Sequence, residues 1–329
     1  MEQLIAQNLK KTYFVKEKAG FFKRSSVRTV EAVKDVSLSI PKGQIVGLLG
    51  VNGAGKTTTI RMLCAIIEPT SGTLTIDNVD AIKNYMSVKS KINMITGGER
   101  NIYWRLTARE NLRYFGSLYN VEKKILEKRI EDLLTSVDLI DAADMPVERY
   151  SKGMKQRLQI ARGLVNDPDY LFLDEPTLGL DIIIAKEMRS YIKKLAVEHN
   201  KGLLLTTHYI AEAGELCDYI HVISKGLIIA SGTKEDLAKL FMAENALEIS
   251  VEPLYDNREK PVIEALQAYN AEMSVRYDSE RHAFIMAGNE LDKSEILSIL
   301  ISGGMEIISV NKKEESLEDI IYSVISSNE

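Results

Sequence analysis

Short apolar runs separated by turn residues dominate the first part of the chain. Hydrophobic and polar positions alternate from Leu4 to Tyr13 and again from Val30 to Ile40, as they do in half-buried strands. The run from 44 to 49 is mainly apolar, which is typical of a buried parallel strand. The pattern then predicts a helix over 56–67, which a Glu-Pro pair ends, and a further strand over 72–79.

Two amphipathic helices are predicted next. Thr107 and Glu110 have the spacing of a capping box, so Thr107 is the expected N-cap of the first helix. Its buried face would carry Leu112, Phe115 and either Leu118 or Tyr119. The second helix has an apolar face made of Ile125, Leu126, Ile130, Leu133, Leu134 and Val137. A helical block therefore interrupts an otherwise α/β pattern.

Alternation of strands and helices resumes after this block. Strands are predicted over 170–173 and 203–207, a helix over 182–198, and a hairpin from 220–223 and 227–230. Beyond residue 246 the predicted strands are 247–251, 273–277, 283–287 and 306–310, and the helices are 260–269, 293–301 and 317–325. The order βαββαβ predicts a small α+β, ferredoxin-like domain over 246–329, after a first domain over 1–235.

Composition narrows the class of protein. The chain has 329 residues, 45% hydrophobic and 27% charged, as in ordinary globular proteins. Its net charge of −5 excludes a generally basic nucleic-acid binder. No apolar run reaches the ~18 residues that a membrane-spanning helix needs. Cys64 and Cys217 lack metal-site spacing and are expected to be reduced thiols of a cytosolic protein.

One segment carries a clear chemical signature. Residues 50–57, Gly-Val-Asn-Gly-Ala-Gly-Lys-Thr, match the P-loop pattern G-x-x-x-x-G-K-[ST] between a predicted strand and a predicted helix. Glycines let backbone amides converge on phosphate oxygens, and the helix N-terminus adds partial positive charge. Lys56 supplies a full charge for the β- and γ-phosphates, and the Thr57 hydroxyl can bind Mg²⁺. This context favours a nucleotide site over a structural glycine turn.

An acidic pair follows the predicted strand at 170–173. Asp174 is placed to hold Mg²⁺, and Glu175 lies past the strand end, where it could orient and deprotonate a water. Alone, the pair would indicate only an acidic turn before a proline. Together with the P-loop, it predicts the second half of a nucleotide-hydrolysing site.

At this point the sequence resembles the ATP-binding subunits of ABC transporters, over residues 1 to about 235. Residues 50–58 resemble the Walker A motif, 150–157 the signature motif, 170–175 Walker B and 178–181 the D-loop. The resemblance implies an α/β P-loop NTPase fold with an antiparallel β subdomain and a helical subdomain at about 99–165. It also implies ATP and Mg²⁺ as cofactors.

The resemblance assigns roles to individual residues. It implies that Lys56, Glu175 and His208 are the catalytic residues, with His208 similar to the switch histidine. It implies that Thr57 and Asp174 are the Mg²⁺ ligands. Cofactor binding falls to Tyr13, Gly50, Val51, Asn52, Gly53, Ala54, Gly55, Lys56, Thr57, Thr58, Ser151, Gly153 and Met154. Tyr13 stands where the family stacks an aromatic ring on adenine, although it could equally pack on its own sheet. Ser151 is also a suitable N-cap for the helix that follows it.

Two features depart from the family pattern. The usual signature is LSGGQ, and Lys152 and Met154 replace a glycine and the glutamine, a variation that resembles drug, antibiotic and sodium exporters. The family also has a glutamine before the helical block, where counting back from Thr107 gives Gly98. Glu99 or a solvent molecule could substitute for that glutamine.

The resemblance implies an ATPase that drives export through a separate membrane permease. Two copies, or this chain and a homologous ATPase, would close head to tail, with each ATP between one P-loop and the partner's signature motif. The expected location is the cytoplasmic face of the membrane, peripherally bound, with no nucleic-acid partner. The C-terminal part resembles domains appended to exporter ATPases of the antibiotic-resistance kind, which could stabilise or regulate the dimer.

Alternatives remain at several points. A non-transport ABC ATPase would carry two cassettes or a long coiled coil, and neither pattern occurs here. A nucleotide-sensing regulatory subunit remains an alternative, because Gly98 stands where the family has a glutamine. Tyr103 and Trp104 either pack beneath the helical block or form a socket for a cytoplasmic helix of the permease. The basic stretch 10–28 is either a solvated loop or a surface near anionic lipid.

Overall fold

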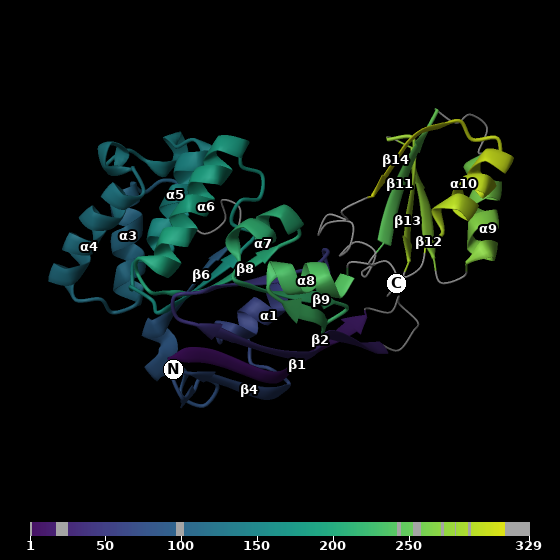
Figure 1. Cartoon of the computed structure of the whole chain (residues 1–329). Coiled ribbons are helices and arrows are strands. Elements are labelled where there is room, and N and C mark those ends of the chain that lie inside the picture. The colour runs from purple at the N-terminus through teal and green to yellow at the C-terminus, as the bar shows by residue number, and fades with distance from the viewer. Residues whose placement is uncertain are drawn as a thin grey trace, which may run out of the picture. The chain divides into compact units, whose positions relative to one another are not determined.

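The chain divides into two compact units, Met1–Lys234 and Glu235–Glu329. A computed structural model describes residues 2–17, 26–96, 102–241, 245–252, 258–270, 273–279, 281–288 and 291–312. Figure 1 shows both units, with the N-terminal strands in purple and the C-terminal strands and helices in green and yellow. Each unit has its own hydrophobic core, so each is described by itself.

A 10-stranded sheet forms the frame of the first unit, in the order β5-β4-β1-β2-β10-β9-β3-β8-β7-β6. The strands β9, β3, β8, β7 and β6 are parallel to one another, whereas β1, β2, β4 and β5 pair antiparallel. The bounds are β1 (Gln3–Glu17), β2 (Ser26–Pro41), β3 (Ile45–Leu49), β4 (Ser71–Ile76), β5 (Val79–Asp80), β6 (Ile92–Thr96), β7 (Tyr170–Asp174), β8 (Gly202–Thr207), β9 (Tyr219–Ser224) and β10 (Leu227–Gly232).

Helices cover both faces of the parallel strands. Leu203 and Leu205 of β8 point into a core shared with α3, α4, α5 and α6, while Leu204 points into a second core with α1, β1, β2 and β4. The first unit thus has a helical side and a β side, with α1 inside the latter (Figure 1). The helices are α1 (Lys56–Leu63), α2 (Tyr85–Val88), α3 (Ala108–Leu118), α4 (Lys123–Ser136), α5 (Lys152–Gly163), α6 (Ile182–Val197), α7 (Ile210–Leu216) and, across the boundary, α8 (Lys234–Phe241).

The predicted capping box is present at the start of α3. The Thr107 hydroxyl accepts from the Glu110 amide at 3.1 Å, and the Glu110 carboxylate accepts from the Thr107 amide at 2.9 Å. Leu112 is fully buried, and Phe115 and Tyr119 pack against the same core. Of the two alternatives for the last position, Tyr119 is therefore the one on the buried face, and Leu118 is exposed. One prediction for this block was wrong: Ile125, on α4, is exposed, because the helix turns this position away from the shared core.

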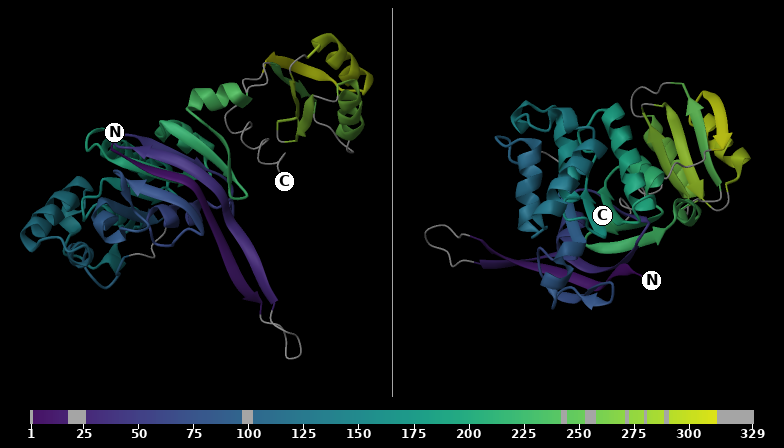
Figure 2. Two further views of the ribbon diagram at one scale, coloured as in Figure 1. Left: turned by 90° about the horizontal axis from the view of Figure 1, so that it is seen from below. Right: turned by 90° about the vertical axis from the view of Figure 1, so that its left-hand side faces the viewer.

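Three predicted boundaries also need correction. Helix α1 ends at Leu63, before the predicted residue 67, and Ala65 has a left-handed φ of 50° that a helix does not accommodate. The predicted strand 72–79 is split by a turn in which Asp77 and Asn78 have φ of 48° and 65°. The strands β1 and β2 run further than predicted, as a long antiparallel pair that takes in part of the basic stretch (Figure 2).

The second unit has the predicted βαββαβ order. Its elements are β11 (Asn245–Val251), α9 (Glu259–Tyr269), β12 (Ser274–Asp278), β13 (Ala283–Gly288), α10 (Lys293–Ser302) and β14 (Ile307–Lys312). The strands form an antiparallel sheet in the order β12-β13-β11-β14. Both helices cover one face of this sheet (Figure 1), around a core that contains Phe284 and Leu266. The helix predicted over 317–325 lies outside the described residues.

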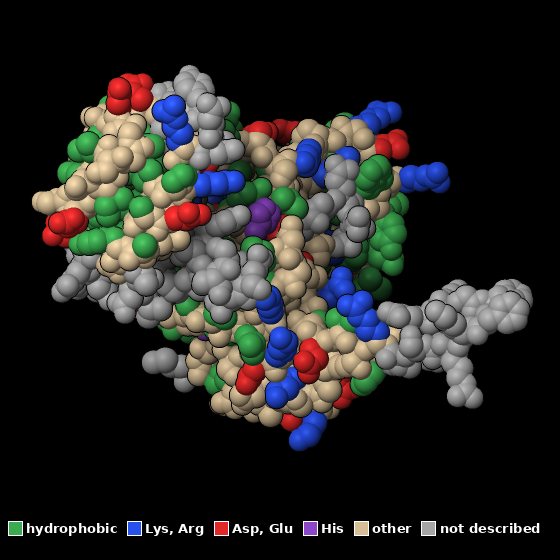
Figure 3. Space-filling view, turned by 90° about the vertical axis from the view of Figure 1, so that its right-hand side faces the viewer, with side chains coloured by type: hydrophobic (Ala, Val, Ile, Leu, Met, Phe, Trp, Pro, Cys, Tyr) green, Lys and Arg blue, Asp and Glu red, His purple; other side chains and the backbone are tan. Residues whose placement is uncertain are grey.

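The surface carries charge of both signs. On the face shown in Figure 3, Lys and Arg side chains are interspersed with Asp and Glu side chains. None of the helices among the described residues is both long enough and apolar enough to cross a membrane.

Candidate active site

The loop between β3 and α1 adopts the backbone that its glycines allow. Gly53 and Gly55 have φ of 85° and 110°, a region that other residues rarely adopt. A Cβ on Gly55 would lie 2.7 Å from the Ala32 carbonyl oxygen, and one on Gly50 would lie 2.4 Å from that of Ile223. A Cβ on Gly53 would have no atom within 4 Å, so the loop is open on that side. Residues of the loop and of the first turn of α1 therefore line an open cavity.

Lys56 holds its ammonium group inside this loop. The side chain is only 6% exposed, and Nζ donates to the carbonyl oxygens of Gly50 at 2.6 Å and Val51 at 3.1 Å. Burial lowers the pKa of Lys56, and the nearby carboxylates of Glu175 and Asp174 partly oppose that change. The result is a fixed cation at the point where the loop would receive phosphate.

Asp174, at the end of β7, meets α1 through a hydrogen bond. The Thr57 hydroxyl donates to Asp174 Oδ2 at 3.1 Å, and the Thr206 hydroxyl donates to Oδ1 at 2.5 Å. Asp174 and Thr206 are paired in register on adjacent parallel strands, β7 and β8, which explains this contact. Three oxygen-bearing side chains thus gather beside the P-loop.

Glu175 follows directly and has a strained backbone. Its φ of 50° is left-handed, and its amide donates to the Thr206 carbonyl oxygen at 3.1 Å and hydroxyl oxygen at 3.2 Å. Glu175 Oε1 lies 3.0 Å from His208 Nδ1 and 3.7 Å from Lys56 Nζ. The Glu175 carboxylate therefore lies between the His208 imidazole and the Lys56 ammonium group.

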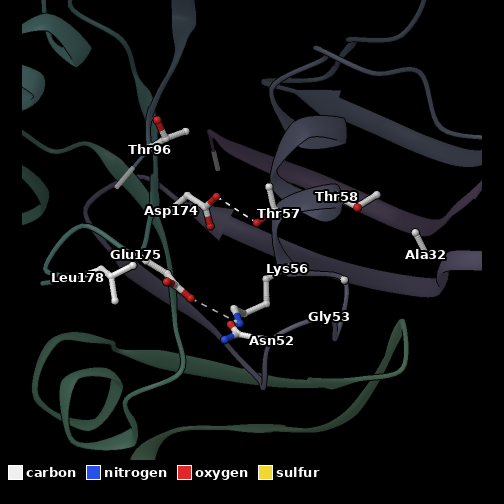
Figure 4. A pocket seen from close by; sticks show the side chains of 11 residues that line it. Ala32, Asn52, Gly53, Lys56, Thr57, Thr58, Thr96, Asp174, Glu175 and Leu178 are labelled. Atoms are coloured by element: carbon white, nitrogen blue, oxygen red, sulfur yellow. Dashed lines mark hydrogen bonds and ion pairs between the residues drawn. The ribbon is translucent and has the colours of Figure 1, made fainter. Parts of the chain in front are cut away.

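Lys56, Thr57, Asp174 and Glu175 line one cavity of about 350 Å³ (Figure 4), whereas His208 contacts Glu175 from outside the lining. Figure 4 shows Asp174 and Glu175 facing the P-loop residues across it. The lining residues are Ala32, Asn52, Gly53, Gly55, Lys56, Thr57, Thr58, Thr96, Asp174, Glu175 and Leu178. Sequence reasoning missed Ala32, Thr96 and the Thr206 that supports the carboxylates, and it placed Leu178 in the D-loop without predicting that it lines the cavity. Thr206 gave a signal as the first of two threonines that end an otherwise apolar strand.

Several predicted site residues lie outside this cavity. Tyr13 is on β1, opposite Val30 of β2, with Lys11 Nζ at 5.4 Å from the centre of its ring. Val51 is at the surface of the P-loop, whereas Ala54 is buried and accepts from the Gly226 amide at 2.9 Å. Gly98 and Glu99 lie outside the described residues.

The predicted signature residues stand at the N-terminus of α5. Ser151 is the N-cap, and its hydroxyl accepts from the Met154 amide at 3.2 Å. Ser151 is exposed, Gly153 and Met154 are half-buried, and Lys152 Nζ donates to the Gly179 carbonyl oxygen. None of these residues lines the P-loop cavity of its own chain.

Comparison with known proteins decides the family. A family model described as ABC transporter matches residues 33–178. ABC transporter ATP-binding protein NatA of Bacillus subtilis (strain 168) is 44% identical over 210 residues, which cover 64% of this chain and 85% of NatA. Bacitracin transport ATP-binding protein BcrA of Bacillus licheniformis is 32% identical over 296 residues, which cover 90% of this chain and 92% of BcrA. This chain belongs to the ABC transporter ATP-binding proteins.

A solved structure supports the same conclusion. A dimeric ATP-binding cassette in a post-hydrolysis state, bound to ADP and Pi, matches with a TM-score of 0.60 at 26% identity, over 70% of this chain and 98% of that one. The predicted family, its P-loop fold and its ATPase activity are confirmed. As a member of this family, the chain binds and hydrolyses ATP.

Proposed function

We propose that this chain is the ATP-hydrolysing subunit that powers export through a separate membrane permease. The observation that carries the proposal is the convergence of Lys56, Asp174 and Glu175 on one cavity, from the P-loop and the end of β7. BcrA, named for bacitracin transport, matches 90% of this chain, which supports a transport role for the chain as a whole.

The P-loop residues would bind the triphosphate. Gly50 to Thr58 present backbone amides to the phosphate oxygens, and Lys56 Nζ moves from the Gly50 and Val51 carbonyl oxygens to the β- and γ-phosphates. The ammonium group thus exchanges its contacts with the loop carbonyl oxygens for contacts with phosphate oxygens. Tyr13 is proposed to stack on the adenine ring.

The oxygen ligands fit Mg²⁺. The Thr57 hydroxyl and the Asp174 carboxylate lie 3.1 Å apart beside the phosphate loop, and Mg²⁺ prefers such hard oxygen donors together with water and phosphate. The Thr206 hydroxyl, at 2.5 Å from Oδ1, fixes the orientation of the Asp174 carboxylate. Mg²⁺ held there by Thr57 and Asp174 would neutralise negative charge that develops on the phosphates during hydrolysis.

Glu175 is proposed to activate the attacking water. Its carboxylate accepts a proton as the water oxygen bonds to the γ-phosphorus, while the bond from that phosphorus to the β,γ-bridging oxygen breaks and ADP leaves. His208, whose Nδ1 lies 3.0 Å from Oε1, is proposed to orient the carboxylate and to help stabilise the transferring γ-phosphoryl group. Lys56 stabilises the negative charge of the transferring group.

The active assembly is proposed to be a dimer with a membrane permease. Ser151, Gly153 and Met154 lie outside their own cavity, so they are free to cap the ATP of a second copy or of a homologous ATPase. The chain would bind the cytoplasmic face of the membrane peripherally, through the permease and without nucleic acid. We infer that residues 1–235 form the ATPase domain, with its helical subdomain at 99–165, and that 246–329 form an accessory domain.

Reconstitution with the permease tests this proposal. The chain would be co-purified with the membrane protein of the neighbouring reading frame and placed in liposomes, and ATP turnover would be compared with that of the chain alone. We expect the permease to raise turnover, and Glu175→Gln to abolish it in both preparations. Association with ribosomes or DNA instead of the permease would favour a non-transport ATPase, and ATP binding without turnover in either preparation would favour a nucleotide sensor.

A further inference from the structure

Lys152 stands in the signature segment at a position where the family has a glycine. It follows the N-cap Ser151 and begins α5. The side chain is exposed, and Nζ donates to the Gly179 carbonyl oxygen. Among the described residues, no carboxylate pairs with Lys152. Its positive charge is therefore placed against a neutral acceptor, which binds an ammonium group less strongly than an anion does.

The acceptor belongs to a tight turn shortly after Glu175. The Leu180 amide donates to the Thr177 carbonyl oxygen at 3.1 Å, and Gly179 adopts a left-handed φ of 71°. A Cβ on Gly179 would lie only 2.6 Å from Lys152 Nζ. The absence of a side chain at Gly179 therefore leaves room for the ammonium group against the backbone of this turn.

Other contacts hold α5 beside the same segment without the help of Lys152. Gln156 is buried, and its Nε2 donates to the Pro176 carbonyl oxygen at 2.7 Å. Arg157 Nη2 donates to Glu187 Oε2 at 2.6 Å. Because these contacts anchor the first turns of α5, the Lys152 side chain can change its acceptor while the helix stays in place.

Lys152 does not serve the nucleotide site of its own chain. Among the described residues, it is not one of those that line the P-loop cavity, where Lys56 is already the cation. In the proposed head-to-tail dimer, the signature segment faces the ATP of the second copy. Lysine has a flexible four-carbon side chain, so Nζ can turn from Gly179 toward an anion that binds beside Ser151.

We propose that Lys152 is a catalytic residue for the ATP bound by the second copy. When the dimer closes, its ammonium group leaves the Gly179 carbonyl oxygen and binds the γ-phosphate on the other chain's P-loop. The inference rests on the proposed dimeric ATPase, and it adds to that site a cation that a glycine at this position does not supply.

The added charge acts during phosphoryl transfer. As the water oxygen bonds to the γ-phosphorus and the bond to the β,γ-bridging oxygen breaks, negative charge is redistributed over the oxygens around the phosphorus. Lys152 keeps its proton throughout and stabilises that charge, together with Lys56 of the chain that binds the ATP. Loss of the Lys152 charge should therefore lower the rate of hydrolysis.

Three full-length variants, each reconstituted with the permease, test the role of the charge. Lys152→Met keeps the length of the side chain, Lys152→Gly introduces the family's residue, and Lys152→Arg keeps the charge. We expect the Met and Gly variants to lower kcat roughly 10- to 100-fold, and Lys152→Arg to retain most of it. Lys128→Met, on the exposed side of α4, is the matched control and should leave kcat unchanged. ATP affinity of each isolated variant should equal that of the wild type, which also shows that the variant is folded.

Mixed dimers distinguish action on the second copy from action within one chain. Two differently tagged copies, one with Lys152→Met and the other with Glu175→Gln, would be co-expressed with the permease and purified through both tags. One site of this dimer combines the intact Glu175 of the first copy with the intact Lys152 of the second. We expect the same turnover as in a mixed dimer of wild type and Glu175→Gln, which also has one intact site.

The outcomes separate this inference from the proposed function. Turnover of the mixed dimer at the low level of the Lys152→Met dimer would show that Lys152 acts within its own chain, and would overturn the inference. A wild-type kcat for Lys152→Met would also overturn it, while loss of turnover in Glu175→Gln would leave the proposed function standing. A wild-type complex that does not hydrolyse ATP would overturn both proposals.

Discussion

Lys56 Nζ lies 3.7 Å from Glu175 Oε1, although the two residues are far apart in the sequence, one at the start of α1 and the other directly after β7. The pair joins the residue that would bind the γ-phosphate to the residue that would deprotonate the attacking water. Because phosphate competes with Glu175 for the same ammonium group, ATP binding would release the carboxylate toward the water. The Glu175 carboxylate would then keep its contact with His208, whose Nδ1 lies 3.0 Å from Oε1.

Glu175→Gln should separate ATP binding from hydrolysis. The amide keeps the size of the side chain and cannot accept the proton of the attacking water. We expect turnover to fall about 10²- to 10⁴-fold, the range typical of a lost general base, while ATP affinity is retained and a closed dimer accumulates. Turnover would be measured by phosphate release and dimerisation by light scattering; hydrolysis at the parent rate would show that another group is the base.

Lys56→Ala should weaken nucleotide binding itself. The variant loses charge-assisted hydrogen bonds to phosphate, worth about 2 kcal/mol, or roughly 30-fold in the dissociation constant. Titration with a fluorescent ATP analogue would measure the change. Lys83→Ala is the matched control, because Lys83 is 82% exposed and its Nζ pairs with Asp80 at 3.3 Å, away from the P-loop cavity. Equal affinity in the two variants would contradict the role of Lys56.

Thr206→Val should lower turnover more than ATP affinity. Thr206 touches no substrate in the proposed mechanism, but its hydroxyl donates to Asp174 and accepts from the Glu175 amide. Loss of that positioning should reduce kcat about tenfold and raise the Mg²⁺ concentration needed for half-maximal rate. Thr207→Val is the control, since the Thr207 hydroxyl serves the Tyr209 amide instead. Similar kinetics for both valine variants would count against the positioning role.

His221 should make the protein less stable in acid. Burial lowers its pKa from 6.5 to about 4, and Nδ1 contacts the Ser231 hydroxyl at 2.7 Å. Below pH 6.5 the unfolded chain binds a proton that the folded chain does not, so the free energy of unfolding falls until about pH 4. The contribution is about 3 kcal/mol.

Urea unfolding of the wild type and of His221→Gln would measure this effect. The glutamine variant keeps a polar side chain and cannot titrate, so its loss of stability between pH 6.5 and about pH 4 should be smaller. An identical acid dependence in the two proteins would show that His221 does not contribute.

The sequence predicted the parts of the site that are local. The spacing of the glycines from Gly50 to Thr57 is enough to predict the turn there. The apolar run that ends in Asp174 is enough to predict a buried strand. Thr206 and Ala32 were missed because their roles depend on which strands become neighbours: β8 beside β7, and β2 against the P-loop. Local pattern does not contain that information.

The wrong predictions outside the site have a similar origin. Ile125 is an apolar residue at helical spacing, yet only tertiary packing decides which side of a helix meets the core. Asp77 and Asn78 break a predicted strand because both adopt left-handed φ, which their short polar side chains tolerate. The βαββαβ order of the second unit, by contrast, followed directly from the alternation of apolar positions.

The central claim is that Gly53, Lys56 and Asp174 converge to hold a metal-bound triphosphate. A crystal structure of the chain with Mn²⁺ and a non-hydrolysable ATP analogue tests it most directly, because anomalous scattering locates the metal independently of the nucleotide. We expect the metal peak beside the Thr57 hydroxyl and Asp174, with the phosphates over residues 53–57. A metal and nucleotide bound elsewhere on the chain, in crystals grown with both in excess, would contradict the account.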